Sequence, residues 1–118
     1  MQLIGHPLAP YESLLHAKTK AEIRQNCVFK FDENLIKTAI EKKVDFGVFC
    51  NEISQAIIAN AVGAKLIICE KNLAQNFAKL AQFYLFDSKI ACIIKTDSEL
   101  ENLAELEVDT AIYEQALT

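Results

Sequence analysis

Short apolar segments alternate with longer amphipathic segments along most of this chain. Five of the apolar segments have the length of a strand, and each runs directly into polar residues that favour the start of a helix: Cys27–Phe31, Phe46–Cys50, Lys65–Cys69, Ile90–Ile94 and Thr110–Tyr113. Strands that alternate with helices in this way are typical of a parallel α/β sheet. The pattern therefore predicts a mostly parallel sheet of five or six strands built from βα repeats.

The segments between the strands have the period of helices. Residues 32–44 place their apolar side chains on one stripe, with Asp32 as the expected N-cap. The segment Glu52–Val62 is apolar on nearly every side, so we expect it to be buried or to pack against a partner. Gly63 follows it and suits a left-handed helix end. Two further helices are expected to begin at the capping-box patterns Asn72-x-x-Gln75 and Thr96-x-x-Glu99.

Residues 1–26 give a less regular pattern. Thr19-x-x-Glu22 is another capping-box pattern, which favours a strand over Ser13–Ala17 followed by a short helix over Lys20–Gln25. A helix over Tyr11–Ala17 is the alternative. The chain of 118 residues is otherwise interpreted as one α/β domain over residues 1–118.

Strand polarity suggests an arrangement for the sheet. Lys65–Cys69 and Ile90–Ile94 are apolar on both faces, as in central parallel strands, whereas Cys27–Phe31 and Thr110–Tyr113 are more mixed and favour edge positions. The expected architecture is a three-layer sandwich of flavodoxin-like or Rossmann-like topology. A consecutive half-barrel is the alternative, since a full eight-stranded barrel needs roughly 200 residues or more.

Composition supports a globular protein. Hydrophobic residues make up 52% of the chain and charged residues 24%. The apolar runs are too short to span a bilayer, and the N-terminus lacks the pattern of a signal peptide. We therefore expect a cytoplasmic protein with no membrane partner. The four cysteines lie in strand-like runs without zinc-site spacing, which predicts buried free thiols.

Charge is unevenly distributed along the chain. All twelve lysine and arginine residues lie in residues 1–95, and seven acidic residues with no basic residue follow from Thr96 onward. Such an acidic block is typical of a solvated helix face, or less often of a docking surface for a basic partner. The net charge of −4 argues against a nucleic-acid partner.

Ligands of parallel sheets bind at the carboxyl ends of the strands. The three glycines do not follow strands in the pattern of a dinucleotide site or a P-loop, so no cofactor is predicted, and no metal site either. Helix capping is the simpler interpretation of Asp32 and Asn51, whereas Glu70 has no evident capping role. The residues expected at the carboxyl edge are Asp32, Asn51, Glu70, Lys95 and Glu114.

No catalytic motif is present, so the pattern favours a non-catalytic protein-interaction module that self-associates as a homodimer. This hypothesis is based on the apolar helix Glu52–Val62 and on the acidic C-terminal segment. The alternative is a domain that binds a small anionic or cationic ligand, or a divalent metal, at the carboxyl ends of the strands, with a minimal enzyme as one form of this alternative. Neither hypothesis identifies a specific substrate or partner.

Overall fold

The computed structural model describes every residue from Met1 to Thr118. The seven strands are β1 (Gln2–Ile4), β2 (Leu15–His16), β3 (Cys27–Lys30), β4 (Phe46–Phe49), β5 (Leu66–Ile68), β6 (Lys89–Ile94) and β7 (Thr110–Tyr113). The four helices are α1 (Glu33–Lys42), α2 (Ile53–Ala61), α3 (Lys71–Phe83) and α4 (Leu100–Glu105), and 3₁₀ turns cover Lys20–Glu22, Asp97–Glu99 and Glu114–Ala116. None of the helices has the length and apolar character needed to cross a membrane.

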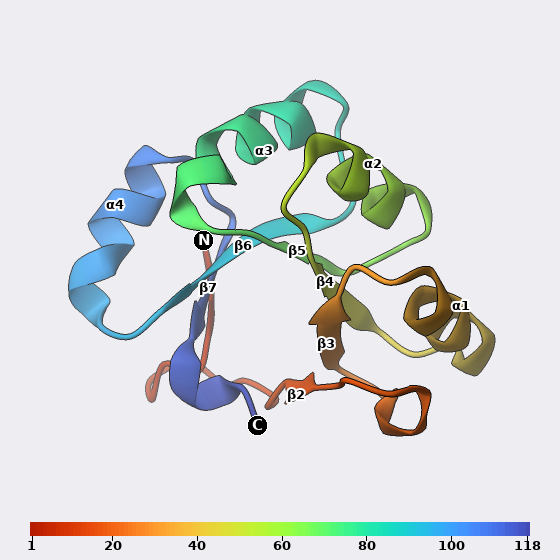
Figure 1. Cartoon of the computed structure of the whole chain (residues 1–118). Helices are drawn as coiled ribbons and strands as arrows, with labels where there is room; N and C mark the ends of the chain where they lie inside the picture. The colour runs from red at the N-terminus through yellow and green to blue at the C-terminus, as the bar shows by residue number, and fades with distance from the viewer.

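All seven strands are parallel and form one sheet in the order β1-β7-β6-β5-β4-β3-β2. From β2 to β7 each strand lies beside the one before it. Since the crossover connections of parallel strands are right-handed, a consecutive order puts all the helices on one face. Figure 1 shows the four helices on the outside of a curled sheet.

The prediction of a mostly parallel α/β sheet is confirmed, but the sheet has seven strands rather than five or six. Its consecutive order agrees with the half-barrel alternative. It differs from flavodoxin-like and Rossmann-like topologies, in which the strand order reverses once and helices cover both faces. The difference arises because the polarity of a strand indicates how deeply it is buried, not in which direction the next crossover leads.

The curl of the sheet brings its two sides together through the last residues of the chain. Leu14 and Leu117 form a parallel bridge. The Leu14 amide donates to the Ala116 carbonyl at 2.8 Å, and the Thr118 amide donates to the Leu14 carbonyl at 2.9 Å. Figure 1 shows the C-terminus beside β2. These bonds join the β2 edge to the segment that follows β7, so the sheet is curled rather than open and flat.

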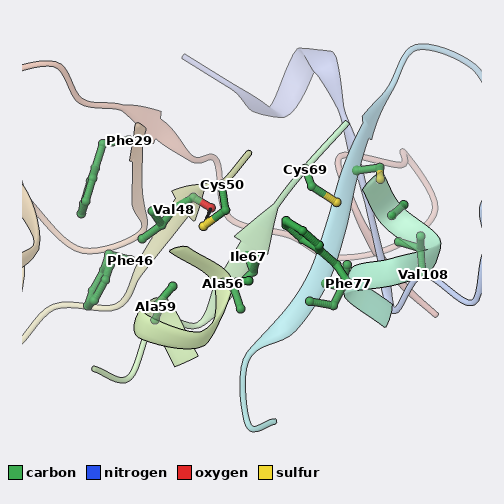
Figure 2. Packing of buried hydrophobic residues seen from close by; sticks show 14 of the residues in the cluster. Phe29, Phe46, Val48, Cys50, Ala56, Ala59, Ile67, Cys69, Phe77 and Val108 are labelled. Carbon is green, nitrogen blue, oxygen red and sulfur yellow. Dashed lines mark hydrogen bonds between the residues drawn. The ribbon is translucent and has the colours of Figure 1, made fainter. Parts of the chain in front are cut away.

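Two apolar layers cover the two faces of the sheet. The larger cluster lies between the sheet and the helices and includes Phe77 of α3 and the stacked rings of Phe29 and Phe46, whose centroids are 5.7 Å apart (Figure 2). A smaller cluster fills the concave face and contains no residue of α1 to α4: Ile4, Leu14, Val28, Leu66, Ile68, Ala91, Ile112 and Ala116. Burial of these layers is the main force that holds the sheet in its curled form.

The two strands predicted at the edges are instead internal. β3 lies between β2 and β4, and β7 lies between β1 and β6. Both are covered by very short strands of the N-terminal region. The predicted strand over Ser13–Ala17 is confirmed as β2, and the following helix is shortened to the 3₁₀ turn Lys20–Glu22. β1 was not predicted, because three residues are too few to establish a period of two.

Most helix ends follow the predicted chemistry. Asp32 caps α1, since its carboxylate accepts the Asn34 and Leu35 amides at 2.8 and 3.0 Å. Both threonine capping boxes form, at Thr19 and Thr96. Gly63 ends α2 with a φ of 88°. The capping box predicted at Asn72 is wrong, because the N-cap of α3 is Glu70 and the helix begins at Lys71.

Helix α2 is only half buried. Ala56 and Ala59 face the sheet and are fully buried, whereas Ile53, Ile57 and Ile58 are 42–47% exposed. The expectation of an all-round buried helix therefore fails within one copy of the chain, because the sheet covers one side and no other element covers the opposite side.

Candidate functional site

The carboxyl ends of the strands surround an open cavity of about 1430 Å³. The strand register places Lys30 opposite Phe49 and Phe49 opposite Ile68. The residues two positions later, Asp32, Asn51 and Glu70, therefore lie at one level along this edge, and all three line the cavity. The structure thus brings together three of the five residues that the sequence placed at the carboxyl edge.

The other two predicted residues, Lys95 and Glu114, do not line this cavity. They follow β6 and β7, and their side chains approach each other at 4.0 Å. Both are exposed, so this ion pair contributes little to stability. Glu114 follows β7, which contributes no residue to the cavity, and Lys95 follows β6, which does line it, but the Lys95 side chain lies toward Glu114.

The concave side of the cavity is apolar and partly aromatic. Phe49, Ile68 and Ile93 line it, and the imidazole of His16 lies against the Phe49 ring with a centroid distance of 5.3 Å. His16 is exposed and comes from β2, next to β3. An apolar floor with a few polar side chains around it is the usual construction of a small-molecule site.

Basic side chains predominate among the groups that remain free to meet a ligand. Lys18 and Lys30 line the cavity, and neither takes part in an ion pair. The Asp32 carboxylate is occupied by its two helix amides. Glu70 is exposed at the N-cap of α3 and makes no side-chain capping bond there. Sequence reasoning missed Lys18 and Lys30, since Lys30 lies at the end of a strand-like run and Lys18 follows a strand whose existence the sequence left open.

The third lysine at the cavity, Lys71, is held by an acid outside it. Its ammonium group lies 2.6 Å from the Glu99 carboxylate. That carboxylate also accepts the amides of Lys95 and Thr96 at 2.7 and 3.1 Å. The hydrogen bond from Lys71 is the largest cause of a lowered pKa at Glu99, and the bonds from the two amides come next. Together they lower the pKa of the Glu99 carboxyl to about 2. Lys71 is therefore committed to the capping box of the 3₁₀ turn after β6.

A second polar cluster lies beside β7. The Tyr113 hydroxyl donates to the Asp97 carboxylate at 2.6 Å, and Nε2 of His6 lies 3.5 Å from the same oxygen. The tyrosine bond lowers the pKa of Asp97 and raises that of Tyr113 to about 12. Nδ1 of His6 accepts the Leu8 amide at 3.0 Å. The cluster holds the loop after β1 in place. It was not predicted, because no local sequence pattern links residues so distant in the chain.

The acidic C-terminal segment is largely engaged within the chain. Besides Asp97 and Glu99, Glu107 accepts a hydrogen bond from Gln82 at 3.0 Å, and Asp109 accepts the Ile90 amide at 3.2 Å. These acids connect the 3₁₀ turn, α4 and the strands to their neighbours. The charge asymmetry therefore has a local structural role.

A smaller cavity of about 660 Å³ opens at the opposite edge, near the amino ends of β1, β3, β4 and β5. Its acidic side chains are already bonded: Glu12 accepts from Asn26, and Asp45 accepts from Gln25 at 2.8 Å. This cavity lacks the free cations of the carboxyl edge.

No three histidine, cysteine or acidic side chains are grouped so that they could hold a metal ion. Comparison with protein-family models and with characterised proteins found no match to this chain.

Proposed function

We propose that this protein is a small-ligand-binding domain and that its ligand is an anion held in the carboxyl-edge cavity. The observation that carries the proposal is the pair of unpaired lysines, Lys18 and Lys30, beside an apolar floor. Carboxyl ends of parallel strands are the usual ligand-binding edge of α/β proteins. The sequence pattern left a small anionic or cationic ligand, or a divalent metal, open at this edge. The proposal keeps the edge and restricts the ligand to an anion.

The groups around the cavity suit a molecule with an anionic group and an apolar part. Lys30 at the end of β3 and Lys18, two residues after β2, supply positive charge, and a ring N–H of His16 can donate a further hydrogen bond. Phe49 and Ile68 offer apolar surface, and the Asn51 amide can both donate and accept. Glu70 at the far side disfavours a second anionic group there, which selects against extended polyanions.

Thermal unfolding with added anions tests the proposal. We expect phosphate or citrate at saturating concentration to raise the melting temperature, because a ligand at about 100 times its Kd adds roughly 2.7 kcal/mol of stability. In Lys30→Gln this increase should be reduced by half or more. Lys37→Gln is the matched control, because Lys37 is exposed on α1 and does not line the cavity.

Three results would contradict anion binding at this site. One is the absence of any shift with phosphate, pyrophosphate and citrate. Another is an equal loss of the shift in both lysine variants, which would indicate a general effect of charge. The third is stabilisation by magnesium chloride or a diamine alone, which would assign the cavity to cations through Glu70.

We also infer self-association through α2, as the sequence hypothesis of a homodimer suggests. The supporting observation is the exposure of Ile53, Ile57 and Ile58 on one helix. Three isoleucines side by side in water are unfavourable, and a second copy of the same helix would cover them.

The dimer is tested by light scattering at increasing protein concentration. We expect the wild-type chain to approach twice the monomer mass and Ile57→Glu to remain a monomer, because the new carboxylate would be buried without a partner. Gln75→Glu adds the same charge at an exposed position of α3 and should still dimerise. A wild-type chain that stays monomeric at high concentration rules the inference out.

A further inference from the structure

Three of the four cysteines stand in one row across neighbouring strands. Phe49 is opposite Ile68 and Ile68 is opposite Ala91, so the next residues, Cys50, Cys69 and Cys92, continue the same level. Backbone bonds extend the ladder to that level, from the Cys50 amide to the Ile68 carbonyl at 2.9 Å and from the Cys69 amide to the Ala91 carbonyl at 3.0 Å. All three side chains belong to the helix-facing core, where Figure 2 shows Cys50 and Cys69.

Within this row, Cys69 and Cys92 form the interacting pair. Cys69 follows Ile68, Cys92 follows its partner Ala91, and the interaction of the two thiols raises the pKa of Cys69 and lowers that of Cys92. The Cys50 thiol instead lies 3.7 Å from the Val48 carbonyl, and burial raises the pKa of Cys50 to about 12. Cys50 is therefore a neighbour of the pair and is not part of it.

The pair also lies at the cavity. Cys69 and Cys92 line it, and Cys69 keeps 7% of its surface exposed. Cys27, by contrast, is completely buried near the amino end of β3 and lines only the cavity at the opposite edge. Cys50 lines the carboxyl-edge cavity as well, so a small reagent that enters it can meet all three thiols of the row.

Backbone spacing allows the two sulfurs to bond. Neighbouring strands lie about 4.8 Å apart, and disulfides join Cα atoms separated by roughly 4.4–6.8 Å. Cys69 directly follows β5, and the bond from its amide to the Ala91 carbonyl keeps it beside β6. We propose that Cys69 and Cys92 are a redox-active thiol pair that hydrogen peroxide converts to a reversible disulfide.

The chemistry balances with peroxide as the oxidant. The thiolate of one cysteine of the pair attacks one peroxide oxygen, the O–O bond breaks, and that cysteine becomes a sulfenic acid while the other oxygen leaves as water. The sulfur of the other cysteine then displaces the sulfenic oxygen as a second water and forms the S–S bond. In total two thiols and one hydrogen peroxide give one disulfide and two waters, and a dithiol reductant reverses the reaction.

Intact-mass measurement of the full chain after mild peroxide treatment tests the proposal. We expect the mass to fall by that of two hydrogen atoms, dithiothreitol to restore it, and peptide mapping to find a Cys69–Cys92 crosslink. Cys69→Ser and Cys92→Ser should each abolish this product, whereas Cys27→Ser and Cys50→Ser should retain it. Far-UV circular dichroism of each variant confirms that it is folded.

Several results would overturn the proposal. A wild-type chain that gains only oxygen atoms, or that stays unmodified under conditions that oxidise a free dithiol peptide, has no reactive pair. A Cys50–Cys69 crosslink would assign the chemistry to the other neighbours of the row. Crosslinks that form only between copies of the chain would show that the thiols react after unfolding.

Discussion

Phe77→Ala is expected to lower the free energy of unfolding by about 3–5 kcal/mol, a large part of the stability of a small protein. Phe77 is 1% exposed and lies in the centre of the layer between α3 and the sheet (Figure 2). Helix α3 packs on β6, one of the central strands. Removing the ring leaves a cavity that the surrounding backbone, fixed by strand pairing, cannot close.

Phe83→Ala on the same helix is the matched control. Phe83 is 78% exposed, so the same truncation removes little buried surface, and we expect a change within about 0.5 kcal/mol. Urea unfolding followed by circular dichroism measures both variants, with unchanged denaturant slope expected in each. Equal losses in the two variants would mean that α3 is not seated on the sheet as described.

Gly5→Ala is expected to destabilise the protein by at least about 2 kcal/mol, because two effects combine. Gly5 has a φ of 105°, which side-chain-bearing residues rarely adopt. A Cβ atom at this position would lie 2.9 Å from the Tyr113 Cβ and 3.0 Å from the Ala116 Cβ. The loop after β1 would have to move away from β7 and from the C-terminal segment.

Gly63→Ala separates these two effects. Gly63 also has a positive φ, of 88°, but a Cβ atom there would meet nothing within 4 Å. We expect a loss of about 1 kcal/mol from the backbone alone. Thermal and urea unfolding of both variants give the comparison. If the two alanine variants lose equal stability, the close contact between Gly5 and β7 is not a stabilising feature of the fold.

Local patterns were enough to predict the repeating units of this fold. The five predicted strands and the first capping residue, Asp32, are confirmed because each depends on a few adjacent residues. The arrangement of the units was not predictable in the same way. The mixed polarity of Thr110–Tyr113 favoured an edge, yet β1 covers that strand and all four of its residues are buried.

The candidate site was predicted in part. Strand ends are visible in the sequence, so Asp32, Asn51 and Glu70 were placed at the correct edge. Glu114 fell outside the cavity because β7 does not border it, and Lys95 because its side chain lies toward Glu114, and neither arrangement can be deduced from a single strand end. Asn51 shows a further limit, because it was expected to cap α2, but the N-cap of that helix is Glu52, and the backbone N–H of Asn51 donates to the Gln55 side-chain oxygen at 2.9 Å.

The pairing of β1 has a consequence for how the chain reaches its native state. Between β2 and β7 every strand pairs with its neighbour in sequence, so these contacts can form progressively along the chain. β1 has β7 as its only strand partner, with Gln2 opposite Thr110, and Leu14 meets Leu117. Such distant contacts form slowly, because the entropy of loop closure is lost before they stabilise the fold. Closure by β1 and residues 114–118 is therefore expected to be the last and rate-limiting step of folding.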